Sequence, residues 1–152
     1  MRANPSRLDL DRITLRLCCG SSDMHYPFKS DGCSVVSDYD QQECCVRHDW
    51  LYWQGGSIQD RARADREFFQ CVRRTRSGWL AAIRWLGVRI GGLGFLPFFD
   101  WRWGYGWEYP RWRAPENDTS PYTVETERAA FEKRLEEARE QDRLEREKKA
   151  NR

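Results

Sequence analysis

The chain lacks a long uninterrupted apolar run and a strong excess of charge of either sign. Its longest apolar stretch, from Trp79 to Phe99, is broken by Arg84, Arg89 and several glycines, so it does not qualify as a simple membrane span. Met1 to Leu17 contain no continuous apolar segment, so no signal peptide is visible. The net charge is only +2, from 26 basic and 24 acidic residues. Composition therefore gives no simple nucleic-acid footprint.

Cysteine, by contrast, is plentiful and confined to the first half of the chain. An even number of cysteines in a short segment favours a disulfide framework formed in an oxidising compartment. A zinc site is the competing interpretation, but no Cys-x-x-Cys spacing occurs and adjacent cysteines chelate one metal poorly. We expect a secreted or extracytoplasmic protein whose disulfide pairing the sequence leaves open. The six residues are Cys18, Cys19, Cys33, Cys44, Cys45 and Cys71.

Helix start and stop signals in the middle of the chain predict a helical hairpin. Asp40-Gln41-Gln42-Glu43 has the pattern of a capping box, and Gly55-Gly56 would end the helix that it starts. Ser57-Ile58-Gln59-Asp60 offers a second cap, and the helix after it should run to about Arg76 and stop at Gly78. Because the turn between the two helices is short, they should pack antiparallel.

With 152 residues the chain has room for one domain and a tail, and we divide it into four segments. Residues 1–27 form an N-terminal segment and residues 28–78 contain a loop and the hairpin. Residues 79–114 are aromatic and basic, and their spacing predicts an amphipathic helix followed by an aromatic loop. Residues 115–152 read as a linker and a charged, solvated helix. The expected fold class is mostly α-helical, with a disulfide-linked hairpin as its core.

The stretch Cys44 to Tyr52 contains the residues with chemical potential. Neighbouring side chains on a helix diverge by roughly 100 degrees, so His48 and Asp49 must face different partners. Cys45 shares a face with Asp49, so a disulfide from Cys45 to Cys33 would pull the loop Asp31-Gly32-Cys33 against the Asp49 carboxylate. Carboxylates and loop carbonyls together are the hard oxygen ligands that suit calcium.

Asp65 is the expected partner of His48. The two residues lie seven before Gly55 and nine after Gly56, so an antiparallel hairpin places them at nearly the same height. Asp65 also lies on the face destined for burial, where a carboxylate needs a partner. An imidazole held by a carboxylate keeps its other nitrogen free to take a proton from water. The alternative is structural: Asp65 caps a helix or pairs with Arg47 or Arg61, and His48 only satisfies it.

At these residues the chain resembles the phospholipase A2 superfamily. The match covers about Asp31 to Cys71: Cys45-Val46-Arg47-His48-Asp49 is similar to the active-site helix, and Asp31-Gly32-Cys33 looks like the short calcium loop of bacterial and fungal members. The loop lacks the glycine-rich repeat of the animal secreted enzymes, and Trp50 stands where they usually carry a cysteine.

The resemblance implies a role for each matching residue. It makes His48 the base that activates water, Asp65 the carboxylate that orients it and Tyr52 a supporting tyrosine. It implies that Asp31, the Gly32 carbonyl and Asp49 hold Ca²⁺. The implied reaction is calcium-dependent hydrolysis of the sn-2 ester of a glycerophospholipid, without a covalent acyl-enzyme.

The aromatic segment has three interpretations. Trp101, Arg102, Trp103 and Trp107 suit a lipid–water interface, where indole lies at headgroup level and guanidinium meets phosphate. The same tryptophans could fill a small core, and stacking on single-stranded nucleic acid ranks lowest because no basic groove is apparent.

We therefore expect a phospholipid hydrolase that works at a membrane surface. One alternative is a catalytically inactive, phospholipase-like lipid-binding module. The other is a structural protein whose charged tail binds a protein partner.

Overall fold

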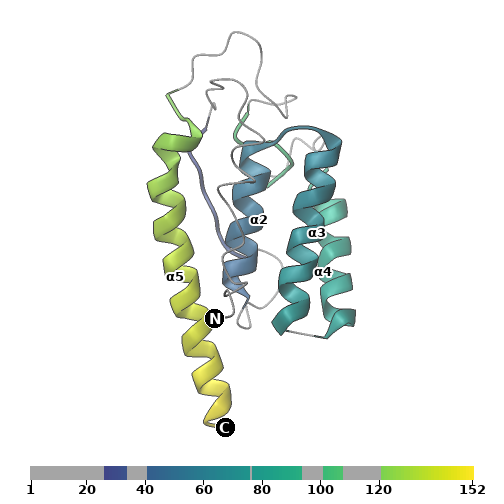
Figure 1. The fold of residues 1–152 in the computed structure, drawn as a ribbon, viewed down its shortest axis with the longest axis vertical. Helices are drawn as coiled ribbons and strands as arrows, with labels where there is room; N and C mark the ends of the chain where they lie inside the picture. Colours follow the sequence, from purple (N-terminus) through teal and green to yellow (C-terminus); the bar gives the residue numbers. More distant parts are fainter. Residues whose placement is uncertain (1–25, 34–40, 76, 94–100, 108–120) are drawn as a thin grey trace, which may run out of the picture.

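The computed structural model describes residues 26–33, 41–75, 77–93, 101–107 and 121–152, and within these ranges it contains four helices and no strand. The mostly α-helical prediction is confirmed. The helices are α2 (Gln42–Gln54), α3 (Ile58–Thr75), α4 (Gly78–Gly91) and α5 (Val124–Ala150). α2 lies between α5 on one side and α3 on the other, and α4 packs against α3 (Figure 1).

The α2–α3 hairpin forms where the sequence predicts it. α2 ends at Gln54, and Gly55 follows with a φ of +69°, a conformation that favours glycine. At the start of α3, the Asp60 amide donates to the Ser57 hydroxyl and the Ser57 amide donates to the Asp60 carboxylate. This reciprocal pair is the second predicted cap. A tight turn with a capped second helix fixes the register of the hairpin.

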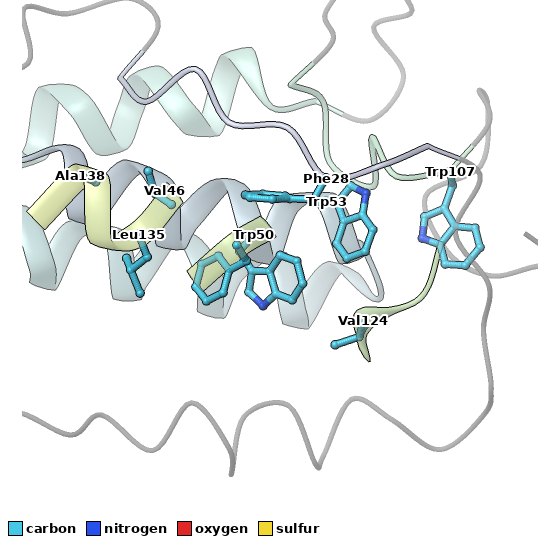
Figure 2. Packing of buried hydrophobic residues seen from close by; sticks show 9 residues of the cluster. Phe28, Val46, Trp50, Trp53, Trp107, Val124, Leu135 and Ala138 are labelled. Atoms are coloured by element: carbon cyan, nitrogen blue, oxygen red, sulfur yellow. The ribbon is translucent and has the colours of Figure 1, made fainter. Parts of the chain in front are cut away.

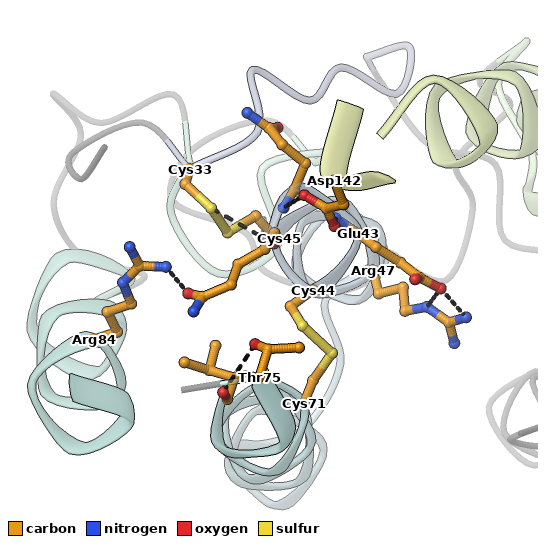
Figure 3. The surroundings of a disulfide bond; sticks show 12 residues. Cys33, Glu43, Cys44, Cys45, Arg47, Cys71, Thr75, Arg84 and Asp142 are labelled. Atoms are coloured by element: carbon orange, nitrogen blue, oxygen red, sulfur yellow. Dashed lines mark hydrogen bonds and ion pairs between the residues drawn. A yellow bond between two sulfur atoms is a disulfide. The ribbon is translucent and has the colours of Figure 1, made fainter. Parts of the chain in front are cut away.

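The N-terminus of α2 is capped by a residue of α5. The helix begins at Gln42, and no side chain of Gln41 caps it. Instead, the Asp142 carboxylate of α5 accepts the amides of Gln42 at 2.8 Å and Glu43 at 3.0 Å (Figure 3). Asp40, the predicted cap, lies outside the described residues. A carboxylate at a helix N-terminus satisfies free amides and complements the helix dipole, so α5 completes the helix that carries His48.

The prediction of a solvated C-terminal helix is wrong for one face of α5. That face packs against α2. The opposite face of α5 is polar and carries ion pairs between Arg143 and the glutamates Glu140 and Glu147. Trp50 of α2 stacks on Phe131 of α5, with ring centroids 4.6 Å apart. Figure 2 shows Trp50 among the buried residues of this core, with Leu135 and Ala138 of α5. The buried α5 residues recur at helical spacing. Some of them are small or polar, so a pattern of large apolar residues does not reveal this buried face. They are Val124, Phe131, Leu135, Ala138 and Asp142.

Two disulfides connect α2 to its neighbours. Cys33–Cys45 confirms the candidate pair and joins the loop before α2 to that helix. Cys44–Cys71 joins α2 to α3 (Figure 3). Because Cys44 and Cys45 are adjacent on a helix, their side chains diverge and reach different elements. Cys18 and Cys19 lie outside the described residues.

The aromatic loop closes over the hairpin turn. The indole of Trp103 donates to the Gly56 carbonyl at 3.1 Å, and the indole of Trp107 donates to the Gln54 carbonyl at 2.9 Å. Arg102 is also buried and donates to backbone carbonyls of its own loop. The interfacial prediction is therefore wrong for these three residues, because their polar groups are used inside the protein. The core alternative describes them correctly.

Of the residues predicted to be interfacial, Trp101 remains partly exposed. Among the described helices, none combines the length and apolarity that a membrane span requires.

We predict that Asp142→Ala lowers the free energy of unfolding by about 1–2 kcal/mol, because two amides of α2 lose their acceptor. Urea unfolding measures this change. Glu140→Ala, two residues earlier and on the exposed side of α5, should change the free energy by less than about 0.5 kcal/mol. Equal effects of the two substitutions would show that the cap does not stabilise α2.

Candidate catalytic site

The hairpin brings His48 and Asp65 together as the sequence predicts. Nε2 of His48 lies 3.0 Å from Oδ1 of Asp65, across the interface between α2 and α3. His48 is 6% exposed and Asp65 is fully buried. A buried carboxylate in contact with an imidazole is thus present, as catalysis by a histidine base requires.

Three further groups surround the Asp65 carboxylate. The Tyr52 hydroxyl donates to Oδ1 at 2.6 Å, the predicted supporting contact. The Arg89 guanidinium of α4 donates to Oδ2 at 3.1 Å, and Nε of Arg61 lies 4.0 Å from the same oxygen. Burial opposes ionisation of Asp65, but the hydrogen bonds from His48 and Tyr52 and the Arg89 contact outweigh burial and lower the pKa of Asp65. The carboxylate therefore stays charged at neutral pH.

The purely structural alternative for Asp65 is only partly realised. Arg47 does not reach Asp65 and pairs with Glu43, one turn earlier on α2, at 2.6 Å. Arg61 lies at the edge of ion-pair distance, and His48 holds the closer contact. Asp65 therefore accepts its close hydrogen bonds from His48, Tyr52 and Arg89 on other helices, and not from a residue of its own helix.

The environment of His48 favours the neutral imidazole. Burial lowers the pKa of His48, and this effect exceeds the opposing influence of the Asp65 hydrogen bond and charge. With Nε2 directed at Asp65, Nδ1 is the nitrogen without a proton, and no described residue hydrogen-bonds it. The ring packs between Tyr52 and Phe68, at centroid distances of 4.1 and 4.8 Å. A neutral, fixed imidazole with one unpaired acceptor is suited to remove a proton from water.

Asp49, the next residue along α2, faces the loop that precedes the helix. Its Oδ2 accepts a hydrogen bond of 2.6 Å from the Ser30 hydroxyl, and the Cys33–Cys45 disulfide ties this loop to α2. Burial, only partly offset by Ser30, and the nearby charge of Asp31 raise the pKa of Asp49 to about 7. Burial and the charge of Asp31 therefore favour protonation of Asp49, and the nearby charge of Arg134 offsets them only in part.

The oxygen atoms of Asp49 and Asp31 are of the kind that calcium prefers as ligands. The described residues contain no group of three or more His, Cys, Asp or Glu side chains placed to hold a metal, so main-chain oxygens would have to complete the ligands. Short loops supply such carbonyls to calcium. Gly32 has a φ of +80°, and a Cβ there would lie 2.2 Å from Oε1 of Gln42, so the loop needs glycine at this point. The Asp49 and Asp31 side chains and the Gly32 carbonyl are the residues that would hold the ion.

Elements far along the chain support this loop, and sequence reasoning missed them. Glu127 and Arg134 of α5 are seven residues apart and contact neighbouring residues of the loop, while Tyr105 reaches it from the aromatic segment. The contacts are Phe28 amide to Glu127 at 3.0 Å, Arg134 to the Ser30 carbonyl at 3.3 Å and Tyr105 hydroxyl to the Lys29 carbonyl at 2.5 Å. The only signal in the sequence is the helical spacing of Glu127 and Arg134 beside the buried stripe of α5.

No protein-family model, curated protein or solved structure matches the chain. The resemblance to phospholipase A2 therefore depends on the residues from Asp31 to Cys71, and the function must be argued from their geometry.

We predict that His48 titrates below the ordinary histidine pKa and that Asp65→Asn lowers the pKa of His48 further, because the substitution removes the charge that stabilises the imidazolium. NMR titration of the imidazole, in a His25→Gln background that leaves one histidine, measures both values. Glu67→Gln, two residues further along α3, is the control and should leave the titration unchanged. A higher His48 pKa in Asp65→Asn would contradict the assigned contact.

Proposed function

We propose that the protein is a calcium-dependent, phospholipase A2-like hydrolase that cleaves the sn-2 ester of glycerophospholipids at a membrane surface. The observation that carries this proposal is the 3.0 Å contact between His48 and Asp65, next to an Asp49 carboxylate that faces a disulfide-tethered loop. A base and a cation site on consecutive helix residues can act on one ester from two directions.

The residues divide the work of hydrolysis as follows. Nδ1 of His48 takes a proton from a water molecule as the water attacks the ester carbonyl. The charged Asp65, kept ionised by Tyr52 and Arg89, stabilises the imidazolium that forms and fixes the orientation of the ring. Calcium, when bound, supplies an electrophile for the lipid phosphate and for the developing oxyanion. When the bond between the carbonyl carbon and the alcohol oxygen breaks, His48 returns the proton to the departing alcohol. Because water and not a side chain attacks the carbonyl, no acyl-enzyme forms.

One observation favours a second function, that of a phospholipase-like module that binds lipid without turnover. His48 is only 6% exposed, so little of the imidazole is open to a substrate in this conformation. A binding module would keep calcium-dependent lipid association and release no fatty acid. The two functions are separated by the following experiment.

We predict that the oxidised protein releases fatty acid from mixed phospholipid vesicles in millimolar calcium and not with a chelator. His48→Gln should reduce the rate by at least about a thousandfold, because the substitution removes the imidazole that takes the proton. Calcium affinity should be unchanged in this variant.

The matched control is His25→Gln, the same substitution at the only other histidine of the chain, which should keep the parent rate. Normal turnover by His48→Gln would refute the catalytic assignment. Calcium-dependent lipid binding by a folded parent that releases no fatty acid would select the binding module.

We also predict that calcium raises the melting temperature by a few degrees at pH 8 and by less at pH 6. Calcium needs the ionised form of Asp49, whose pKa is about 7, so protons compete with the ion as the pH falls through that value. Asp49→Asn should abolish the calcium-induced rise, whereas Glu140→Gln on the exposed side of α5 should preserve it. A rise that is equal at both pH values would exclude Asp49 as a ligand.

A further inference from the structure

The side of α4 that faces away from α3 carries a stripe of large apolar residues. We call it the outer stripe: Trp79, Ile83, Leu86 and Ile90, which are 75%, 45%, 53% and 59% exposed. The spacing of i, i+4, i+7 and i+11 puts all four on one face of the helix. A surface of this kind usually marks an interaction site, because isolated apolar residues are common on proteins but aligned ones are not.

Polar contacts on the inner side of α4 fix the rotation of the helix about its axis, and so they keep the outer stripe exposed. The buried residues of the helix are Ala81 and Arg84, and Arg84 donates to the side chain of Gln41 before α2 (Figure 3). Further along the helix, Arg89 holds Asp65. Rotating α4 to bury the stripe would break both polar contacts. The fold therefore fixes the apolar face outward.

The outer side of α4 is also open. A Cβ added at Gly87, beside Leu86, would meet no atom within 4 Å. Trp85 next to it is 37% exposed and lies under the Arg89 guanidinium, with 5.7 Å from Cζ to the ring centroid. Gly87 and Trp85 thus leave room for a partner beside the stripe.

Charge around the stripe identifies the partner. α4 contains no acidic residue, and the last turn of α3, which leads into it, exposes Arg73 and Arg74. The start of the stripe at Trp79 thus follows exposed cations by a few residues. Anionic headgroups complement such cations, and each cation near an anionic surface adds about 1 kcal/mol of attraction. A second copy of the chain would instead bring the same cations near each other.

We propose that the outer stripe of α4 docks on an anionic phospholipid bilayer, with its apolar side chains among the acyl chains and Arg73 and Arg74 at the headgroups. The inference deepens the proposed function, since it names the surface that would present lipid to the site and replaces Trp103 and Trp107 in that role. Docking itself needs neither turnover nor calcium.

The test uses the His48→Gln protein with a chelator, so that neither hydrolysis nor a calcium bridge contributes. The protein should float with vesicles of equal parts phosphatidylcholine and phosphatidylglycerol. Its binding to vesicles of pure phosphatidylcholine should be weaker. Adding Ile83→Glu and Leu86→Glu should weaken binding about tenfold or more, because both side chains lose their apolar burial. The matched control is Leu144→Glu, an exposed leucine of α5. Figure 1 shows that α5 and α4 lie on opposite sides of α2.

The outcomes decide between distinct partners. Loss of binding in the α4 variant, with Leu144→Glu unchanged, supports docking whether or not the parent protein releases fatty acid. Unchanged vesicle binding by the α4 variant overturns the proposal. A parent dimer that the same variant converts to a monomer, with vesicle binding unaltered, assigns the stripe to a second copy instead. If circular dichroism shows that the double variant is unfolded, Trp79→Ser, at the most exposed position of the stripe, carries the same expectation.

Discussion

The buried charge of Asp65 is the constraint on which the site depends. A carboxylate without solvent must find donors, and here they come from three helices: His48 and Tyr52 from α2, Arg89 from α4 and the more distant Arg61 from α3 itself. Removing any donor leaves the charge less compensated. The hydrogen bonds that compensate the buried charge of Asp65 therefore also hold the His48 imidazole in one orientation. The same contacts contribute to the stability of the fold and to the geometry of the site.

The hairpin and the contact between His48 and Asp65 could be predicted from the sequence because they depend on local rules. Caps and glycines set where the helices end, and the helical rise then sets which residues meet across a short turn. The Cys33–Cys45 pair was a candidate for the same reason, since Cys45 shares a helix face with Asp49. Where neighbours in sequence are neighbours in space, spacing alone is sufficient.

The packing of α5, the burial of Trp103 and Trp107 and the role of Arg89 could not be predicted in that way. Each depends on partners that lie 24 to 100 residues away. Composition was ambiguous as well, because tryptophan suits a core and a lipid interface equally. Trp50 gives the best example: its aromatic ring stacks on Phe131 of α5, which follows it by about eighty residues.

The cap that Asp142 provides also has a consequence for the order of biosynthesis. Asp142 follows Gln42 by 100 residues. A ribosome that has released α2 must still add α3, α4 and the aromatic segment before this carboxylate exists, and synthesis proceeds at roughly 5–20 residues per second. During those seconds the first amides of α2 have no acceptor from α5. A nascent chain thus gains the cap of the helix bearing His48 and Asp49 only after α5 has been made, so the helix with these two residues is completed late in synthesis.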